Sequence, residues 1–406
     1  MVSSEDTSLG KHEERSGSNG RVAEATPRSI GRRALFTQGL VLGASVVGLH
    51  LLDGRLPVAE AAVAPRIPCW EEREIARWEM SERAIGTTRL QTCALGTDGR
   101  IYHTIRYPGG SWQPAFGNVN AQESNGGTLR FTDIDCGGAL DSLHVTAVTR
   151  DGTIWHTIRL ANGSWQPFFG NVNNQESNGK MLRFSDVSCA GTTSSKLHVA
   201  ALTSMGTIWH TIRMANGSWQ PTFGNVNNQE SNGRLLHFTD VDCATVGENL
   251  HVCAINRNGT IWHTIRFANG SWQSSFGNVN NQESNGRLLR FTSVGCAAID
   301  RNLHVTATDE KGVLWHTIRF ANGSWQSSFG NVNNQQSNGG SLRFSDVDCA
   351  NVAGDLQVGA VGLNKALWHT IRFANGSWQG ATGNVNAQES NGGTLNFTSV
   401  GTAGTV

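Results

Sequence analysis

Short segments with the residue pattern of β-strands follow one another along most of the chain. Between Phe131 and Phe169 such segments cover residues 131–136, 143–149, 153–159 and 164–169. Alternation of apolar and polar residues, clearest at 143–149, is typical of strands that bury their two faces differently. Asp151-Gly152 and Asn162-Gly163 favour tight turns, because glycine readily adopts a positive φ. The pattern predicts a four-stranded antiparallel meander.

This meander is repeated. The motif TIWHTIRLANGSW at Thr153–Trp165 returns with little change, so that its last tryptophan stands at positions 112, 165, 219, 272, 325 and 378. The period is 53 or 54 residues, and a unit of this size cannot bury a core of its own. A fixed period of this length predicts a stacked array or a closed ring.

The two ends of the repeated region complement each other. The first copy begins at Leu90 with the second strand of the meander, and the chain ends with a first-strand segment at Phe397–Thr402. Pairing these two segments completes a sheet and leaves no strand edge open. We therefore expect an all-β fold over residues 90–406, a six-bladed β-propeller of four-stranded antiparallel blades closed by the C-terminal strand.

The faces of the strands follow from the turn. If the residues on either side of Asp151-Gly152 pair with each other, the register places His144, Trp155 and Arg159 on one face of the sheet. His156 then lies on the opposite, more apolar face. This register predicts one polar and aromatic face in every blade.

The beginning of the chain has a different character. Arg32-Arg33 precede an apolar stretch at residues 34–52, and Ala59-Glu60-Ala61 has the small residues of a cleavage site. The fragment SIGRRALF resembles a twin-arginine export signal. We expect residues 1–64 to direct a bacterial protein to secretion or to the cell surface, with an uncleaved membrane anchor as the alternative. Residues 65–89 are expected to form a short helical lead-in.

Charge gives little reason to expect a polyanionic partner. The chain has 32 Lys and Arg against 32 Asp and Glu. A balanced chain offers no electrostatic attraction to nucleic acid, or to a membrane after signal cleavage. The oligomeric state is left open.

Five of the eight cysteines recur at one position of the repeat. Equivalent positions on neighbouring blades are expected to lie too far apart for a disulfide, so these cysteines are interpreted as small buried core residues. Cys69 with Cys93 is the one pair that we would test for a bridge. The repeated cysteines are Cys136, Cys189, Cys243, Cys296 and Cys349, with Thr402 in the sixth copy.

The repeat FTDVxCA, LHVxAVTxDGxIWHTIR, NGSWQPF resembles that of PLL-type bacterial propeller lectins and, more distantly, tectonin-like and fucose-binding propeller lectins. The resemblance runs from about Leu90 to the C-terminus and is carried by the Asp-Gly turn, the Trp-His or Tyr-His pair and the Gly-Ser-Trp turn. It implies carbohydrate binding between adjacent blades by an arginine, a glutamate and an aromatic residue. The chain shows six repeats where PLL-type members are expected to have seven blades.

The predicted glycan-binding residues are the repeated aromatic, arginine, histidine and glutamate positions. Aromatic rings stack on the C–H face of a sugar, while the polar groups hydrogen-bond its hydroxyls. The alternative is that arginine and tryptophan only pack the blades together. The predicted residues are Tyr102, Arg106, His144, Trp155, Arg159, Glu176, His198, Trp209, Arg213, Glu230, His251, Trp262, Arg266, Glu283, His304, Trp315, Arg319, Trp368, Arg372 and Glu389.

The loop GNVNNQESNG is the best-preserved part of the repeat. It changes little between copies, with Gln336 replacing the glutamate in the fifth. Loops usually diverge faster than strands. The loop therefore indicates either a ligand contact made in every blade or a recent expansion of the repeats.

Other chemistry has little support in the sequence. The histidines have no cysteine or carboxylate at metal-ligand spacing, so no metal or cofactor is expected. Every blade is alike, whereas an enzyme is expected to break the symmetry at one active site. We expect a secreted, multivalent lectin-like protein that is not an enzyme. A symmetric protein-interaction scaffold and, further removed, a propeller glycoside hydrolase are the alternatives.

Overall fold

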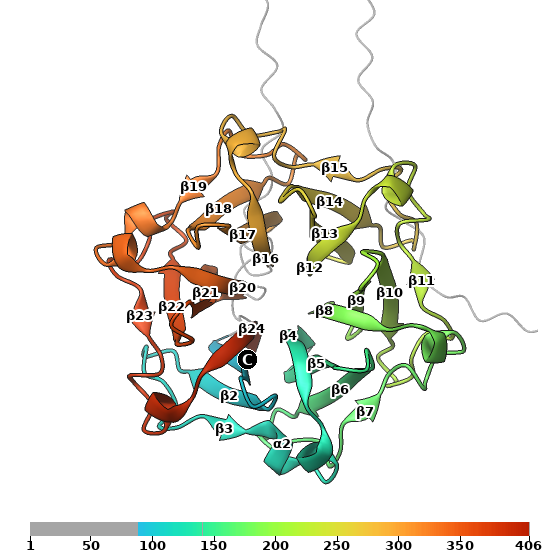
Figure 1. Cartoon of the computed structure of the whole chain (residues 1–406), viewed down its shortest axis with the longest axis horizontal. Coiled ribbons are helices and arrows are strands. Elements are labelled where there is room, and N and C mark those ends of the chain that lie inside the picture. The colour runs from blue at the N-terminus through green and yellow to red at the C-terminus, as the bar shows by residue number, and fades with distance from the viewer. Residues whose placement is uncertain (1–87, 140, 406) are drawn as a thin grey trace, which may run out of the picture. The chain divides into compact units, whose positions relative to one another are not determined.

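Six four-stranded antiparallel sheets surround a central axis in the computed structural model, which describes residues 88–139 and 141–405 (Figure 1). This confirms the six-bladed β-propeller. Blade 1 consists of β24 (Phe397–Thr405), β1 (Arg89–Gly96), β2 (Ile101–Arg106) and β3 (Gly117–Asn118). Blade 2 consists of β4 (Phe131–Ala139), β5 (Ser142–Thr149), β6 (Ile154–Arg159) and β7 (Gly170–Asn171).

The remaining blades repeat this order, with the innermost strand named first. Blade 3 contains β8 (Phe184–Gly191), β9 (Leu197–Thr203), β10 (Ile208–Arg213) and β11 (Gly224–Asn225). Blade 4 contains β12 (Phe238–Val246), β13 (Asn249–Asn256), β14 (Ile261–Arg266) and β15 (Gly277–Asn278). Blade 5 contains β16 (Phe291–Ile299), β17 (Asn302–Asp309), β18 (Leu314–Arg319) and β19 (Gly330–Asn331). Blade 6 contains β20 (Phe344–Val352), β21 (Asp355–Gly362), β22 (Leu367–Arg372) and β23 (Gly383–Asn384).

Short helices connect the blades at the rim of the ring. After each outer strand the chain forms a 3₁₀ turn before it returns to the axis as the next inner strand (Figure 1). The helices are α2 (Val119–Gln122), η1 (Gly126–Thr128), η2 (Gly179–Met181), η3 (Gly233–Leu235), η4 (Gly286–Leu288), η5 (Asn333–Gln335), η6 (Gly339–Ser341) and η7 (Gly392–Thr394). Within residues 88–139 and 141–405, no helix has the length and apolar character needed to cross a bilayer.

The ring closes where the first and last strands meet. β24 pairs antiparallel with β1, with Leu90 opposite Gly404 and Cys93 opposite Gly401. The C-terminal strand is thus the inner strand of blade 1, as the sequence predicts. The leader at residues 1–64 and most of the lead-in at residues 65–89 lie outside the described residues.

The turn between β5 and β6 is one residue longer than predicted. The Thr149 N–H donates to the Thr153 carbonyl at 3.0 Å, so residues 150–152 form a three-residue turn. Gly152 occupies its last position with φ 79, the left-handed conformation that such hairpins require. The predicted pairing across Asp151-Gly152 is therefore wrong, and β6 is shifted by one residue: Ala147 lies opposite Trp155, and Leu143 opposite Arg159.

The outer strand also differs from the prediction of residues 164–169. In that segment Trp165 makes a single bridge to Arg159, and the outer strand is the short β7. The reason is a contact with the preceding blade: the Ser124 N–H donates to the Pro167 carbonyl at 2.9 Å. The segment satisfies its backbone against the neighbouring blade instead of extending its own sheet.

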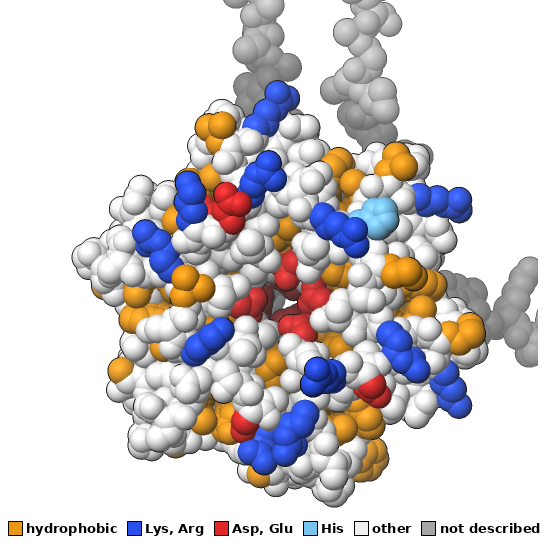
Figure 2. Space-filling model, in the orientation of Figure 1, with side chains coloured by type: hydrophobic (Ala, Val, Ile, Leu, Met, Phe, Trp, Pro, Cys, Tyr) orange, Lys and Arg blue, Asp and Glu red, His pale blue; other side chains and the backbone are white. Residues whose placement is uncertain are grey.

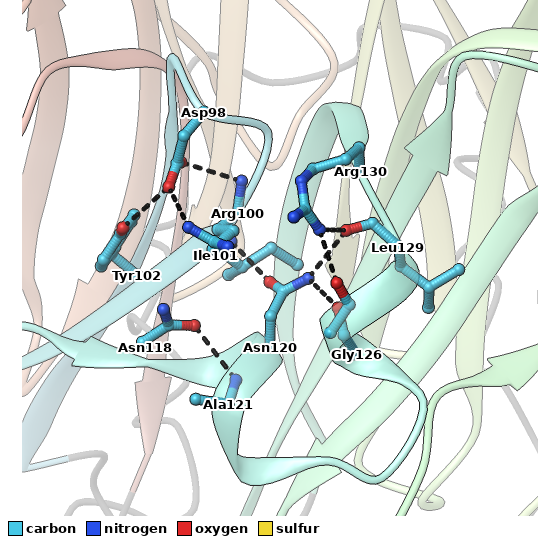
Figure 3. Close-up of polar contacts among 11 residues, drawn as sticks. Asp98, Arg100, Ile101, Tyr102, Asn118, Asn120, Ala121, Gly126, Leu129 and Arg130 are labelled. Atoms are coloured by element: carbon cyan, nitrogen blue, oxygen red, sulfur yellow. Dashed lines mark hydrogen bonds and ion pairs between the residues drawn. The ribbon is translucent and has the colours of Figure 1, made fainter.

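The well-preserved loop has a structural role in every blade. In the first copy the Asn120 side chain accepts from the Ile101 N–H at 2.8 Å and donates to the carbonyls of Gly126 and Leu129 at 2.9 and 3.2 Å (Figure 3). Asn125 forms two hydrogen bonds with the backbone of Phe169 in blade 2. These bonds fix the loop to its own blade and to the next one, which explains its uniformity without a ligand.

The repeated cysteines are buried free thiols, as predicted. They lie on the inner strands and pack into the apolar clusters between blades, such as the one that joins Cys136, Val145 and Phe169. Cys93 is also a buried free thiol, and Cys69 lies outside the described residues.

Candidate functional site

The observed register gives each third strand two different faces. Thr157 and Arg159 of β6 face blade 1, where Arg159 lies near Tyr107. His156 faces blade 3, where its ring meets Trp219 edge-on at 5.5 Å between centroids. Grooves between blades are therefore built from one face of one blade and the opposite face of the next.

The histidines belong to the face opposite the arginine. His144 Nδ1 and His156 Nε2 lie 2.9 Å apart, so both side chains are on one side of the sheet. The expectation that His144 shares a face with Trp155 and Arg159 is wrong, because the longer turn shifts the register. His144 instead faces Arg213 of blade 3, so the predicted residue types meet across a blade boundary.

This histidine pair is preserved around the ring. His198–His210, His251–His263 and His304–His316 repeat it at 2.9, 3.0 and 3.1 Å. In blades 1 and 6 a glutamine replaces the first histidine, as in Gln357–His369 at 2.8 Å. Burial, reinforced by Arg213, lowers the pKa of His144 to about 4. At neutral pH these histidines are uncharged hydrogen-bonding groups.

An arginine at the end of each third strand supplies the positive charge. A Cβ added to Gly163 would lie 3.2 Å from Arg159 Nη2, so the guanidinium packs against the Asn162-Gly163 turn. These side chains are half-buried, and burial lowers the pKa of Arg159. Within the described part of the chain, their guanidinium groups have neither a hydrogen-bond acceptor nor a carboxylate partner. The arginines are Arg106, Arg159, Arg213, Arg266, Arg319 and Arg372.

An aromatic residue and an apolar rim complete the groove. Trp165, beside Arg159, meets His103 of blade 1 edge-on at 5.4 Å. At the boundary between blades 6 and 1 a cavity of about 310 Å³ contains Arg106, Tyr107 and Phe373. This volume is at the lower end of small-molecule sites and accommodates a monosaccharide. Trp165 was not predicted as a site residue, although the recurrence of Gly-Ser-Trp was the available signal.

The predicted tryptophans lie away from the arginines. Trp155 is on the same face as Arg159, as predicted, but four residues along a strand correspond to about 13 Å. Trp155 packs between blades 1 and 2 near the start of β6. Trp315 donates to Asp309 at 3.0 Å and Tyr102 to Asp98 at 3.0 Å, both in the hairpin-turn region. Trp209, Trp262 and Trp368 take the same position, so this aromatic set does not line the arginine grooves.

The predicted glutamates are buried between blades. Glu230 accepts from the Thr264 hydroxyl of the next blade, Glu283 from Thr317, and Glu389 closes the ring on Thr104. Glu176 is 2% exposed and faces Thr211. Glu123, which sequence reasoning missed, bonds Thr157 in the same way. Burial raises the pKa of each to about 7.

Acidic side chains gather on the axis of the ring. The carboxylate oxygens of Asp135, Asp242 and Asp348 come within 4.8 Å of one another, and all three residues are buried. Burial raises the pKa of all three, and the neighbouring carboxylates of the group raise the pKa of Asp135 and Asp348 further. Oxygen ligands of this kind suit Mg²⁺ or Ca²⁺, and these are the described residues that could hold a metal. In the sequence the histidines were the candidate metal ligands, and these aspartates were missed.

No protein-family model and no curated protein matches the chain. Similar solved structures include a triple-arginine variant of AofleA from Arthrobotrys oligospora, with 10% identity, 79% of this chain and 91% of that one covered, and a TM-score of 0.50. The fucose-specific lectin from Aleuria aurantia shows 15% identity, 73% and 91% coverage and a TM-score of 0.48. BP39L lectin from Burkholderia pseudomallei shows 14% identity, 73% and 81% coverage and a TM-score of 0.47. The AofleA likeness supports the propeller fold.

Proposed function

We propose that this protein binds carbohydrate in the grooves between its blades. The observation that carries the proposal is the row of half-buried guanidinium groups without an acceptor in the described part of the chain. A guanidinium held by packing presents several N–H donors in a fixed plane. Sugar hydroxyls are acceptors of the required kind, and each such charge-assisted hydrogen bond contributes about 1.5 to 3 kcal/mol.

The surroundings of each arginine suit a sugar. Neutral histidines or a glutamine on the neighbouring blade offer further hydrogen-bonding groups. The apolar residue that follows the arginine gives a surface for the C–H face of the ring, as Phe373 does at the boundary between blades 6 and 1. Asp355 is the one carboxylate among the described residues that line that cavity, so it lacks the paired carboxylates that glycoside hydrolysis usually requires, and the proposed activity is binding.

Repetition around the ring makes weak sites useful. A surface that displays many copies of a glycan engages several grooves at once, and linked binding raises avidity by about 10² to 10⁴ over a single site. The twin-arginine-like leader at residues 1–64 supports action outside the cell, where such surfaces occur. The resemblance to fucose-binding propellers makes L-fucose the first sugar to test.

The experiment measures stoichiometry as well as affinity. A glycan array with the full chain identifies a sugar, and calorimetry with that monosaccharide gives the number of sites per ring. Arg159→Gln is expected to reduce that number by one, and Arg159→Gln with Arg266→Gln and Arg372→Gln by three. Arg183→Gln, at the other end of the strands, is the control. An array without any bound glycan, or an unchanged stoichiometry in the triple variant, would refute the proposal.

A further inference from the structure

We propose that one face of the ring docks onto a bilayer that contains anionic lipids. This face, called the basic face, lies where the inner strands begin (Figure 2). It is formed by the hairpin turns between the middle strands, the 3₁₀ turns at the rim and the residues just before the inner strands. Between blades 2 and 3, the Phe184 N–H donates to the Gly152 carbonyl at 3.0 Å and Arg183 Nη1 donates to the Lys180 carbonyl at 2.8 Å. These bonds bring Arg150, Lys180 and Arg183 into one patch.

Cations occupy the same positions around much of the ring, and Figure 2 shows them encircling the central opening. The acidic residues exposed on this face, within the described part of the chain, are Asp98, Asp151 and Glu310. Asp98 is already paired with Arg100 at 3.0 Å. The further exposed cations are Arg130, Arg234, Arg257, Arg287, Arg290, Lys311, Arg343 and Lys365.

The balanced composition conceals this surface because the fold places acids and bases differently. The loop glutamates are buried between blades, where desolvation raises the pKa to about 7 at Glu230 and Glu283. The aspartates at the axis are recessed in the central opening, and burial also raises the pKa of Asp135. The basic side chains named above remain exposed on the surface. A chain with no net charge therefore presents a cationic face.

Aliphatic side chains project from the same face. Met181 is 82% exposed, Leu235 82% and Leu288 87%, and each directly follows a cation on its 3₁₀ turn. Met205 and Leu363, in hairpin turns at the same end of the strands, are 74% and 60% exposed. Elsewhere in the described chain, no large apolar side chain exceeds the 52% of Phe168.

The combination of side chains favours a bilayer over a soluble polyanion. Proteins that bind single-stranded nucleic acid pair basic grooves with aromatic stacking surfaces. The projecting residues here are methionine and leucine, which enter the apolar part of a membrane interface while adjacent cations meet lipid phosphates. Lys180-Met181, Arg234-Leu235 and Arg287-Leu288 form such pairs on consecutive blades, so one sector of the rim makes the contact.

The rest of the ring supplies the matched substitutions. At the positions of these pairs, the other blades have Gly127-Thr128, Gly340-Ser341 and Gly393-Thr394. The variant Lys180→Gly, Arg234→Gly, Arg287→Gly thus removes charge with residues that this fold already accepts. The variant Met181→Thr, Leu235→Thr, Leu288→Thr removes the exposed apolar side chains, again with a residue that other blades have at this position. Replacing Arg89, Lys196 and Arg301, at the other end of the strands, by serine is the charge-matched control.

The test is co-sedimentation of the full chain with vesicles of phosphatidylcholine alone or with 30% phosphatidylglycerol. All variants carry the same residues 1–64, so any contribution of that segment cancels. We expect binding to the anionic vesicles that weakens about five-fold for each cation removed and about ten-fold or more for each aliphatic residue removed. The control variant is expected to bind like the unmodified chain.

Three results would overturn the proposal. The first is equal binding to the two vesicle types. The second is undiminished binding by both the triple glycine variant and the triple threonine variant, provided that each variant unfolds at the same denaturant concentration as the unmodified chain. The third is tight binding of heparin or single-stranded DNA that depends on the three cations but not on the three aliphatic residues, with no vesicle binding; this would identify a soluble polyanion as the partner. These vesicles contain no glycans, so the outcome is independent of the proposed glycan binding in the grooves.

Discussion

Glu230→Gln is expected to stabilise the ring at alkaline pH and to destabilise it slightly at acidic pH. Glu230 is 4% exposed, its Oε1 accepts from the Thr264 hydroxyl, and its Oε2 has no hydrogen-bond partner in the described structure. Burial is the dominant cause that raises its pKa from 4.5 to about 7. In the folded ring the ionised carboxylate is therefore disfavoured.

The magnitude follows from linkage. A folded-state pKa above the unfolded value gives stability that is complete below pH 4.5 and is lost as the pH rises through 7. The shift corresponds to about 3 kcal/mol between these limits. Glutamine carries no charge, and its unsatisfied amide hydrogens cost about 1 kcal/mol. The free energy of unfolding of Glu230→Gln should thus be about 2 kcal/mol higher than that of the unmodified protein at pH 8, and about 1 kcal/mol lower at pH 4.5.

Urea unfolding at pH 4.5 and pH 8, followed by tryptophan fluorescence, measures both differences. The fifth repeat offers the reverse experiment, because Gln336 already donates to the Thr370 hydroxyl at this position. Gln336→Glu should lose stability at pH 8, but by less, since Thr382 donates a second hydrogen bond there. Glu310→Gln, on an exposed residue, is the control for a general charge effect. A stability difference for Glu230→Gln that is the same at both pH values would refute the reasoning.

Three further predictions concern other buried polar groups. His144→Gln, which copies the arrangement of blades 1 and 6, should raise the free energy of unfolding, measured in urea at pH 5, by up to about 2 kcal/mol. Folding lowers the His144 pKa from 6.5 to about 4, so the stability that neutral His144 contributes is present above pH 6.5 and is lost on acidification. Asn173→Ala should cost about 2 to 5 kcal/mol in urea unfolding, because it leaves buried backbone groups unpaired, whereas Asn174→Ala on the exposed neighbour should change stability by less than about 0.5 kcal/mol. Asp135→Asn should stabilise the ring at pH 8 by about 1 kcal/mol or more, because burial and the neighbouring Asp348 and Asp242 oppose ionisation of the Asp135 carboxyl group in the folded ring. A lower stability than that of the unmodified chain at pH 8 would contradict it.

The architecture was accessible from sequence because it depends on covalent order. The six copies of the repeat and the first-strand segment that begins at Phe397 are both visible in the sequence. The closure onto the strand that contains Leu90 follows from pairing the two ends. The positions of the three inner strands of each blade also follow from composition and turn signals, whereas the outer strand at residues 164–169 was predicted wrongly. These features need no knowledge of which side chains meet across space.

The face assignment failed on a single residue of turn length. Asp151-Gly152 is compatible with a two-residue turn and with the observed three-residue turn, and local sequence does not separate them. A shift of one residue moves every side chain of a strand to the other face. His144 was thereby assigned to the side of Arg159, although it contacts His156 on the opposite side. Predicting the groove also required knowing which faces of neighbouring blades meet, because its two walls come from residues about 50 positions apart in the chain.

The distribution of charge was the other property that composition could not provide. In a count of charged residues, Glu230 and Arg234 have equal weight and cancel. The fold buries Glu230 against Thr264 and exposes Arg234 on the 3₁₀ turn, so only Arg234 contributes to the surface charge. The axis could have been anticipated, because Asp133 and Asp135 lie on the inner strand of a closed ring, where equivalent residues converge. A repeated acidic position on that strand indicates a recessed, high-pKa cluster and leaves the outer surface basic.

The two proposed surfaces lie at opposite ends of the same strands. β6 begins beside the hairpin turn of the basic face and ends at Arg159, in the groove. A ring held on an anionic bilayer through the Lys180-Met181 sector would therefore direct its arginine grooves away from that bilayer. Because each surface acts through its own residues, membrane binding does not consume a groove. The geometry thus permits one protein to connect a lipid surface with glycans on another surface, and the substitutions at Arg234 and Arg159 separate the two activities.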